Sequence, residues 1–223
     1  VAVGTKHSCA LLDDGSIKCW GSNEFGQLGQ GDTTNRGTQW DHMGYNLDAV
    51  DLGQDRFAIA IAAGKYHTCA VLDSNSVKCW GKNEFGQLGL GVPDNRGDQK
   101  NEMGDNLPPV DLGTGFKAIA IAAGDDNTCA LAATGQVKCW GANTRGQLGQ
   151  GSNAGKGSGP NQMGDNLPPV NLGAAYFAVA IAAGAQHNCA LLDNGSIKCW
   201  GANDAGQLGN ADKRPRGLPP NEM

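Results

Sequence analysis

Eight cysteines form four C-x9-C pairs, and each pair is repeated 60 residues after the one before it. The cysteines are Cys9, Cys19, Cys69, Cys79, Cys129, Cys139, Cys189 and Cys199. Thiols at this spacing could form a disulfide within each pair, contribute to zinc sites, or remain reduced and buried. Structural zinc usually requires C-x2-4-C knuckles, and one such pair supplies only half a site. Every copy keeps both cysteines, which favours disulfides and therefore an oxidising compartment.

Histidine precedes the first cysteine by two residues in three copies, as His7, His67 and His187, and Asn127 takes that place in the remaining copy. A ring of histidines around an axis could bind a metal, sense pH or serve an active site. Asparagine replaces histidine best as a hydrogen-bonding group, so we expect this position to brace a turn. No Ser-His-Asp order or H-E-x-x-H motif occurs, and the carboxylates recur as turn residues. The sequence therefore predicts no enzyme activity, with no catalytic, cofactor-binding or metal-binding residues.

The turn between the two cysteines of a pair predicts how they meet. Leu12 and Ser16 flank three residues, the last of which is Gly15, Asn75, Gly135 or Gly195 in the four copies. These residue types tolerate positive φ, as a three-residue hairpin with a type I turn and a bulge requires. Counting back from this turn places Cys9 directly opposite Cys19 on the same face. The register thus predicts a cross-strand disulfide in each hairpin.

The elements around these hairpins are predicted to be strands. Apolar residues alternate with period two in residues 57–64, and the proline-containing stretch 107–113 suits a short edge piece. No window shows a helical stripe of useful length. About four short strands per unit, repeated, predict an all-β β-propeller of four-stranded blades. The tryptophans that follow the second cysteines, Trp20, Trp80, Trp140 and Trp200, are expected to be buried between blades.

The repeat also predicts the domain organisation. Residues 1–223 form a single propeller region in units 1–60, 61–120, 121–180 and 181–223, incomplete at both ends. We expect this region to be part of a larger ring, whose bare sheet edges are covered by further blades or another chain.

Charge and hydropathy exclude two kinds of partner. The net charge of −5 and the pI near 5.2 argue against nucleic acid and against a polybasic membrane surface. The longest apolar runs are eight residues, whereas a membrane-spanning helix needs roughly 20. The sequence predicts neither nucleic-acid binding nor membrane insertion.

Three recurring strings resemble a known repeat. They are G-x-x-H-x-C-A-L, D-G-x-I/V-K-C-W-G and N-x-x-G-Q-L-G, the last within W-G-x-N-x-x-G-Q-L-G in every copy. They resemble the repeat of the regulator of chromosome condensation family along the whole chain. The resemblance implies a β-propeller, usually of seven four-stranded blades. The long unit and the cysteine pairs depart from the usual repeat and resemble variants in predicted secreted proteins of bacteria and algae. The nuclear exchange and chromatin-binding activities of the founding member are therefore not carried over.

These observations predict a secreted, non-enzymatic structural or protein-interaction scaffold whose partners are other protein chains or further blades of the same polypeptide. The alternative is a guanine-nucleotide exchange factor or regulator of a small GTPase, which reduced cysteines would favour. An enzyme that uses the propeller axis is a third hypothesis and rests on the histidines alone.

Binding residues are expected where the copies differ most, because variable loops on a fixed scaffold encode binding. The copies differ in the pair before the histidine position and in the loop that follows the second strand. The candidate interaction residues are Lys6, Phe25, Tyr66, Phe85, Asp126, Arg145 and Gln186. Asn194 begins an N-glycosylation pattern, Asn194-Gly195-Ser196, and is a possible modification site.

Overall fold

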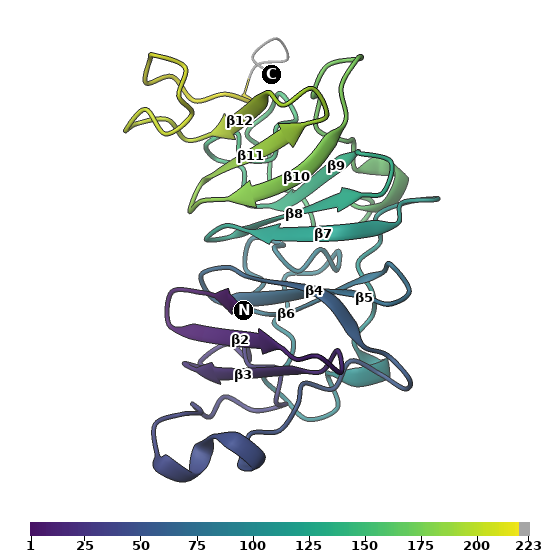
Figure 1. Cartoon of the computed structure of the whole chain (residues 1–223), viewed down its shortest axis with the longest axis vertical. Coiled ribbons are helices and arrows are strands. Elements are labelled where there is room, and N and C mark those ends of the chain that lie inside the picture. The colour runs from purple at the N-terminus through teal and green to yellow at the C-terminus, as the bar shows by residue number, and fades with distance from the viewer. Residues whose placement is uncertain (219–223) are drawn as a thin grey trace.

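The chain folds into four antiparallel sheets of three strands each. The structure is a computed structural model and describes residues 1–218, so the last five residues of the predicted fourth unit lie outside the described part. The sheets have the orders β1-β2-β3, β4-β5-β6, β7-β8-β9 and β10-β11-β12. They follow one another along the longest axis of the molecule (Figure 1). The predicted all-β repeat architecture is confirmed.

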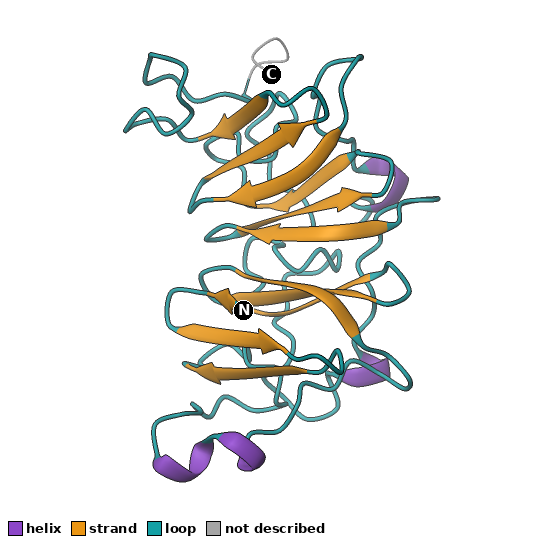
Figure 2. Ribbon diagram, viewed as in Figure 1, coloured by secondary structure: helices purple, strands orange, loops and turns teal. Residues whose placement is uncertain are grey.

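The strands and the short 3₁₀ helices recur with the repeat (Figure 2). The strands are β1 (Ala2–Val3), β2 (His7–Leu11), β3 (Ile17–Gly21), β4 (Ala58–Ala63), β5 (His67–Leu72), β6 (Val77–Gly81), β7 (Ala118–Ala123), β8 (Asn127–Ala132), β9 (Val137–Gly141), β10 (Ala178–Ala183), β11 (His187–Leu192) and β12 (Ile197–Gly201). The 3₁₀ helices are η1 (Trp40–His42), η2 (Gly44–Asn46), η3 (Gly104–Asn106) and η4 (Gly164–Asn166).

The cysteine hairpins have the predicted register. Leu12 N donates to Ser16 O at 2.9 Å, and Gly15 takes a φ of +79°, as the bulged turn requires. Cys9 then lies directly opposite Cys19 between β2 and β3. Each of the four pairs is joined by a disulfide, with Cα atoms 4.0–4.1 Å apart.

In the first three units the predicted fourth strand is reduced to two points of attachment, and in the fourth unit the described residues include the first of them. In the second unit, Gly81 pairs with Arg96 in an isolated bridge, and Val110 N donates to Val77 O at 2.8 Å. Pro108 and Pro109, which precede Val110, have no N–H to extend this contact into a ladder. The sheets of the second and third units therefore have three strands and a loosely tethered outer edge. The first unit has the same arrangement with Asp48 and Ala49 in place of the prolines.

The core lies between the sheets. Between the second and third sheets, the Cys69–Cys79 disulfide and Leu88 pack in one cluster with Ala130 and Trp140 of the next unit. Equivalent clusters fill the first and third interfaces. Trp80, Trp140 and Trp200 are fully buried, as predicted. Trp20 is only partly buried, contrary to the prediction, because no preceding unit covers it within residues 1–218.

The face of the fourth sheet that points away from the third sheet is likewise not covered by another unit within residues 1–218. Ile197 is 67% exposed, whereas Val77 and Val137 at the same repeat position are 0% exposed. The Cys189–Cys199 disulfide on this face is partly exposed, and the other three disulfides are fully buried.

This difference predicts the order in which the disulfides are reduced. Thiol–disulfide exchange requires access of the attacking thiolate to a sulfur atom. Dithiothreitol under native conditions should therefore open Cys189–Cys199 first, while the other three bonds persist until the chain unfolds. Timed alkylation followed by peptide mass mapping measures this order. Simultaneous alkylation of all four pairs in the folded chain would contradict it.

The four units turn about a common axis. Gly4, Gly64, Gly124 and Gly184 line one shared hollow of about 280 Å³. The histidines do not line this hollow, and His7 and His67 are buried between sheets instead. The ring of histidines, on which the hypothesis of an active site at the axis rests, therefore does not line the hollow there.

Candidate interaction face

One backbone hydrogen bond per unit brings the two variable segments together. In the second unit, Lys82 N donates to Tyr66 O at 2.9 Å. The equivalent bonds join Ser22 to Lys6, Ala142 to Asp126 and Ala202 to Gln186. The turn before each histidine position and the loop after each second strand therefore emerge side by side. We call the surface formed by residues 5–6, residues 22–25 and their 60-residue repeats the loop face.

A buried asparagine fixes the loop in each unit. Asn83 Oδ1 accepts a hydrogen bond from Leu88 N at 2.9 Å, and its Nδ2 donates to Val92 O at 2.6 Å. Phe85 N donates to Gln87 Oε1 at 2.9 Å, which closes the tip of the loop. These bonds recur in the other copies, where Asn23, Asn143 and Asn203 are also buried. The loop backbone is thus fixed, and the side chain at its tip is free to vary.

Aromatic side chains from the first two units meet on this face. The rings of Phe25 and Tyr66 lie 5.2 Å apart at an angle of 55°. The Lys82 ammonium lies 5.4 Å from the centre of the Phe25 ring and 5.6 Å from that of Phe85. Phe85 is 43% exposed, and Phe25 and Tyr66 are partly buried. We call Phe25, Tyr66, Lys82 and Phe85 the aromatic patch.

Charges flank the aromatic patch. Lys82 Nζ is 2.7 Å from Glu84 Oε2. Gln87 Nε2 donates to Asp126 Oδ1 at 3.3 Å. Burial raises the pKa of the Asp126 carboxyl, and the positive charges of Lys82 and Lys65 oppose that shift. The loop face is therefore aromatic in the first two units, with an excess of positive charge in the second, and becomes more acidic in the third.

The structure brings together only some of the predicted interaction residues. Phe25, Tyr66 and Phe85 join the aromatic patch, and Asp126 adjoins it through Gln87. Arg145 lies apart from them and pairs with Asp204 across 3.6 Å. Within residues 1–218, the side chains of Lys6 and Gln186 are exposed and take part in no hydrogen bond or ion pair.

Asn194 also lies away from the aromatic patch, in the turn between β11 and β12. It is exposed, and its Oδ1 accepts from Ser196 N at 2.9 Å. Glycosylation at this residue stays a prediction.

Lys82, which contacts both the Phe25 and the Phe85 ring, was not among the interaction residues predicted from the sequence. The signal was available, because the equivalent position holds Ser22, Lys82, Ala142 or Ala202 and varies as much as the position of Phe25 and Phe85. The position is the variable one in the W-G-x-N string, and the string itself did not single it out.

Among the described residues, no group of three or more His, Cys, Asp or Glu side chains could hold a metal ion. In the same part of the chain, no helix has the length and apolar character needed to cross a membrane.

Repeated sheets around an axis, with fixed loops that carry variable side chains on one face, define an arc of β-propeller blades. Two family models, both described as the Regulator of chromosome condensation (RCC1) repeat, match the chain. One matches residues 1–27, 58–87, 118–147 and 178–207, and the other matches residues 75–131 and 134–191. The chain belongs to the regulator of chromosome condensation (RCC1) repeat family.

The relatives of this chain are longer proteins with different names. The mitochondrial RCC1 domain-containing protein RUG3 of Arabidopsis thaliana is 32% identical over 225 residues, which cover 98% of this chain and 45% of that protein. The human E3 ubiquitin-protein ligase HERC2 is 31% identical over 212 residues, which cover 94% of this chain and 4% of the ligase. This chain spans less than half the length of both relatives.

A solved structure shares the fold. Prp20p of Saccharomyces cerevisiae aligns with a TM-score of 0.69 and 22% identity, over 98% of this chain and 48% of Prp20p.

Proposed function

We propose that the chain is an extracellular, non-enzymatic scaffold that docks a partner protein on its loop face through the aromatic patch. The observation that carries this proposal is the convergence of Phe25, Tyr66 and Phe85, from two units, on a fixed backbone. Buried asparagines fix the loops of Phe25 and Phe85, and the bond from Lys82 N to Tyr66 O ties the Tyr66 turn to the second of these loops. Large aromatic side chains on a rigid frame supply contact area at low entropic cost and dominate many protein interfaces.

The four disulfides support the extracellular setting. Disulfides persist in oxidising compartments and are rare in the cytosol, where thiols are kept reduced. All eight cysteines are paired in the structure, each within its own hairpin.

The family supports the regulator of a small GTPase as the second candidate. Prp20p has described binding properties toward Gsp1p and histones. Such regulation takes place where thiols are reduced, so the disulfides favour the extracellular scaffold over this candidate.

The proposal can be tested by site-specific photo-crosslinking. Variants with p-benzoylphenylalanine in place of Phe85 or Ile119 compare two sites of equal exposure, 43% and 45%, on different surfaces. Irradiation in the extracellular fraction of the source organism should yield a discrete adduct from position 85 only. Unlabelled wild-type chain should compete for this adduct, whereas the triple variant Phe25→Ala, Tyr66→Ala, Phe85→Ala should not.

Two outcomes would overturn the proposal. One is competition by the triple variant equal to that of the wild type, provided that its disulfides and circular dichroism are unchanged. The other is reduced cysteines in the natively isolated protein together with accelerated nucleotide release from a small GTPase, which would establish the second candidate.

A further inference from the structure

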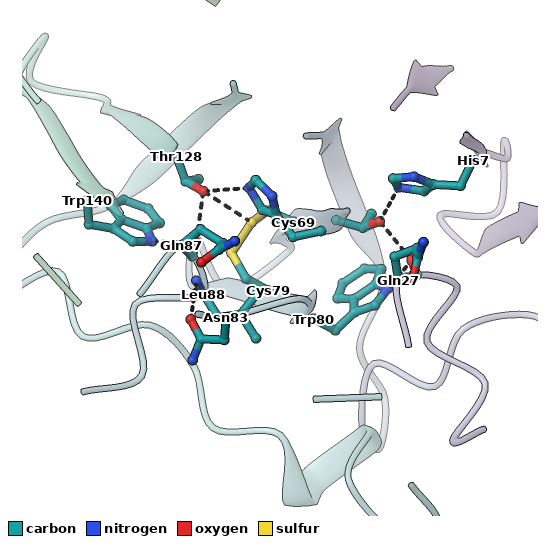
Figure 3. Close-up of a disulfide and its surroundings, with 12 residues drawn as sticks. His7, Gln27, Cys69, Cys79, Trp80, Asn83, Gln87, Leu88, Thr128 and Trp140 are labelled. Atoms are coloured by element: carbon teal, nitrogen blue, oxygen red, sulfur yellow. Dashed lines mark hydrogen bonds between the residues drawn. A yellow bond between two sulfur atoms is a disulfide. The ribbon is translucent and has the colours of Figure 1, made fainter. Parts of the chain in front are cut away.

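A buried polar node crosses the interface between the first and second sheets. Gln27 O accepts hydrogen bonds from Thr68 Oγ1 at 2.8 Å and from Trp80 Nε1 at 3.1 Å. The imidazole Nε2 of His7 lies 2.9 Å from the same Thr68 Oγ1. His7 and Gln27 belong to the first unit, and Thr68 and Trp80 belong to the second. Figure 3 shows His7, Gln27 and Trp80 around this node.

The hydrogen bonds of the node determine which ring nitrogen of His7 carries the proton. A carbonyl oxygen can only accept, so the single hydroxyl proton of Thr68 is directed at Gln27 O. His7 Nε2 must therefore donate to Thr68, which leaves Nδ1 without a proton. This Nδ1 is buried and has no hydrogen-bond partner among the described residues. A second proton on the ring would have no acceptor.

The interface between the second and third sheets repeats this node. His67 Nε2 lies 2.9 Å from Thr128 Oγ1. Thr128 Oγ1 donates to Gln87 O at 2.9 Å (Figure 3). Trp140 Nε1 donates to Gln87 O at 3.0 Å. His67 Nδ1 is likewise buried and unpartnered within residues 1–218.

The third interface has the same connections without a titratable group. Asn188 Nδ2 donates to Gln147 O at 2.7 Å, in the place of the threonine. Asn127 Nδ2 lies 3.3 Å from Asn188 Oδ1, in the place of the histidine. The chain thus contains two His–Thr interfaces and one Asn–Asn interface on the same framework.

Within residues 1–218, neither histidine forms an ion pair with a carboxylate. His7 is 2% exposed and His67 is 0% exposed. Burial lowers the pKa of His7 to about 4. Burial, with a smaller contribution from His7, lowers the pKa of His67 to about 3. The charged residues of the neighbouring turns, Lys6, Lys65, Asp125 and Asp126, are not among the causes of either shift.

We propose that His7 and His67 make the first and second blade interfaces sensitive to acid: these interfaces open as the pH falls from 7 to 5, while the Asn–Asn interface stays closed. We call the two histidine interfaces the acid-sensitive catch. An imidazolium formed in either interface can be hydrated only if the two sheets separate locally. Phe25 and Tyr66 lie on opposite sides of the first interface, and Tyr66 directly precedes His67. Opening therefore splits the aromatic patch, and the consequence for partner binding rests on the proposed function.

The direction and size of the effect follow from linkage. The pKa of each histidine is lower in the closed state than in the open state, so closure is favoured above the open-state value of 6.5 and weakens as the pH falls below it. With an open-state pKa of 6.5 and a closed-state pKa of about 4 or below, the opening constant rises about 20-fold per histidine between pH 7 and pH 5. That factor corresponds to about 1.8 kcal/mol. Carboxylates with ordinary pKa values stay largely ionised across this range. Burial raises the pKa of Asp126, which is bonded to Gln87 across the second interface, and a variant that replaces His67 while keeping Asp126 separates the two groups.

Hydrogen exchange measured by mass spectrometry on the oxidised chain tests the catch. Protection factors at pH 7 and pH 5, corrected for intrinsic exchange, are compared for peptides from the three interfaces. Protection should fall about 20-fold at the first and second interfaces and stay nearly constant at the third. The matched variants His7→Asn/Thr68→Asn and His67→Asn/Thr128→Asn install the Asn–Asn pair and should each abolish the fall at their own interface.

The reverse variant, Asn127→His/Asn188→Thr, should transfer the pH response to the third interface. It keeps the test decisive if an Asn–Asn variant fails to fold. An equal loss of protection at all three interfaces would overturn the proposal, and so would an unchanged loss in a folded Asn–Asn variant. These readouts need no partner, so the catch and the proposed function can fail independently.

Discussion

Replacement of Trp140 by alanine should lower the free energy of unfolding by about 3–5 kcal/mol, the cost of removing a fully buried indole. Trp140 is 0% exposed and packs against Leu88, Val110 and Met163 in the second interface. The substitution opens a cavity between two sheets and also leaves Gln87 O with one hydrogen-bond donor fewer. Urea titration followed by circular dichroism measures the loss.

Trp20 is the matched control for this prediction, because it has the same place in its strand. It is only partly buried, and its indole has no hydrogen bond within residues 1–218. Trp20→Ala should therefore cost clearly less than Trp140→Ala. Equal losses would mean that the indole is needed within its own sheet, and a loss below about 1 kcal/mol for Trp140→Ala would contradict the packing between blades.

Replacement of Gly64 by alanine should destabilise the chain by about 3 kcal/mol, near the upper end of ordinary overpacking effects. A Cβ atom at this position would overlap the imidazole of His67 and the carbonyl oxygen of Gly124 in the next unit. The backbone of Gly64 does not have positive φ, so the cost arises from space between the sheets. Thermal and urea unfolding measure the effect.

Gly184 provides the control at the same repeat position. The three atoms nearest to a Cβ atom there all belong to the ring of His187, which is partly exposed and can move aside. Gly184→Ala should therefore be much milder than Gly64→Ala. If both substitutions were equally harmful, the requirement for glycine would come from the turn itself and not from the neighbouring blade.

Local features of the fold could be predicted from the sequence, because the residues that determine them are close along the chain. A single position with positive φ, Gly15 or its equivalents, sets the hairpin register and hence the disulfide pairs. The alternating apolar pattern likewise predicts strands such as β4, which spans Ala58–Ala63. The fourth strand was overestimated. In the second and third units the prolines that suit a sheet edge also prevent a ladder, whereas the first unit lacks the ladder without having these prolines.

Features that join two units could not be predicted from one unit alone. The contact between Phe25 and Tyr66 depends on the rotation between blades, which no local pattern encodes. The histidine position was expected to brace a turn, and it instead bonds to a threonine of the next blade. A signal for that partner exists within the chain, since His7 and His67 each precede a threonine by 61 residues, whereas Asn127 precedes Asn188.

The placement of each disulfide inside one hairpin has a consequence for how the protein oxidises. Eight cysteines allow on the order of a hundred complete pairings. Each native bond joins cysteines only 10 residues apart, whereas the next cysteine along the chain is 50 residues away. Loop-closure statistics favour the shorter loop by about tenfold. Each bond can therefore close as soon as its own hairpin emerges during synthesis, without help from later parts of the chain.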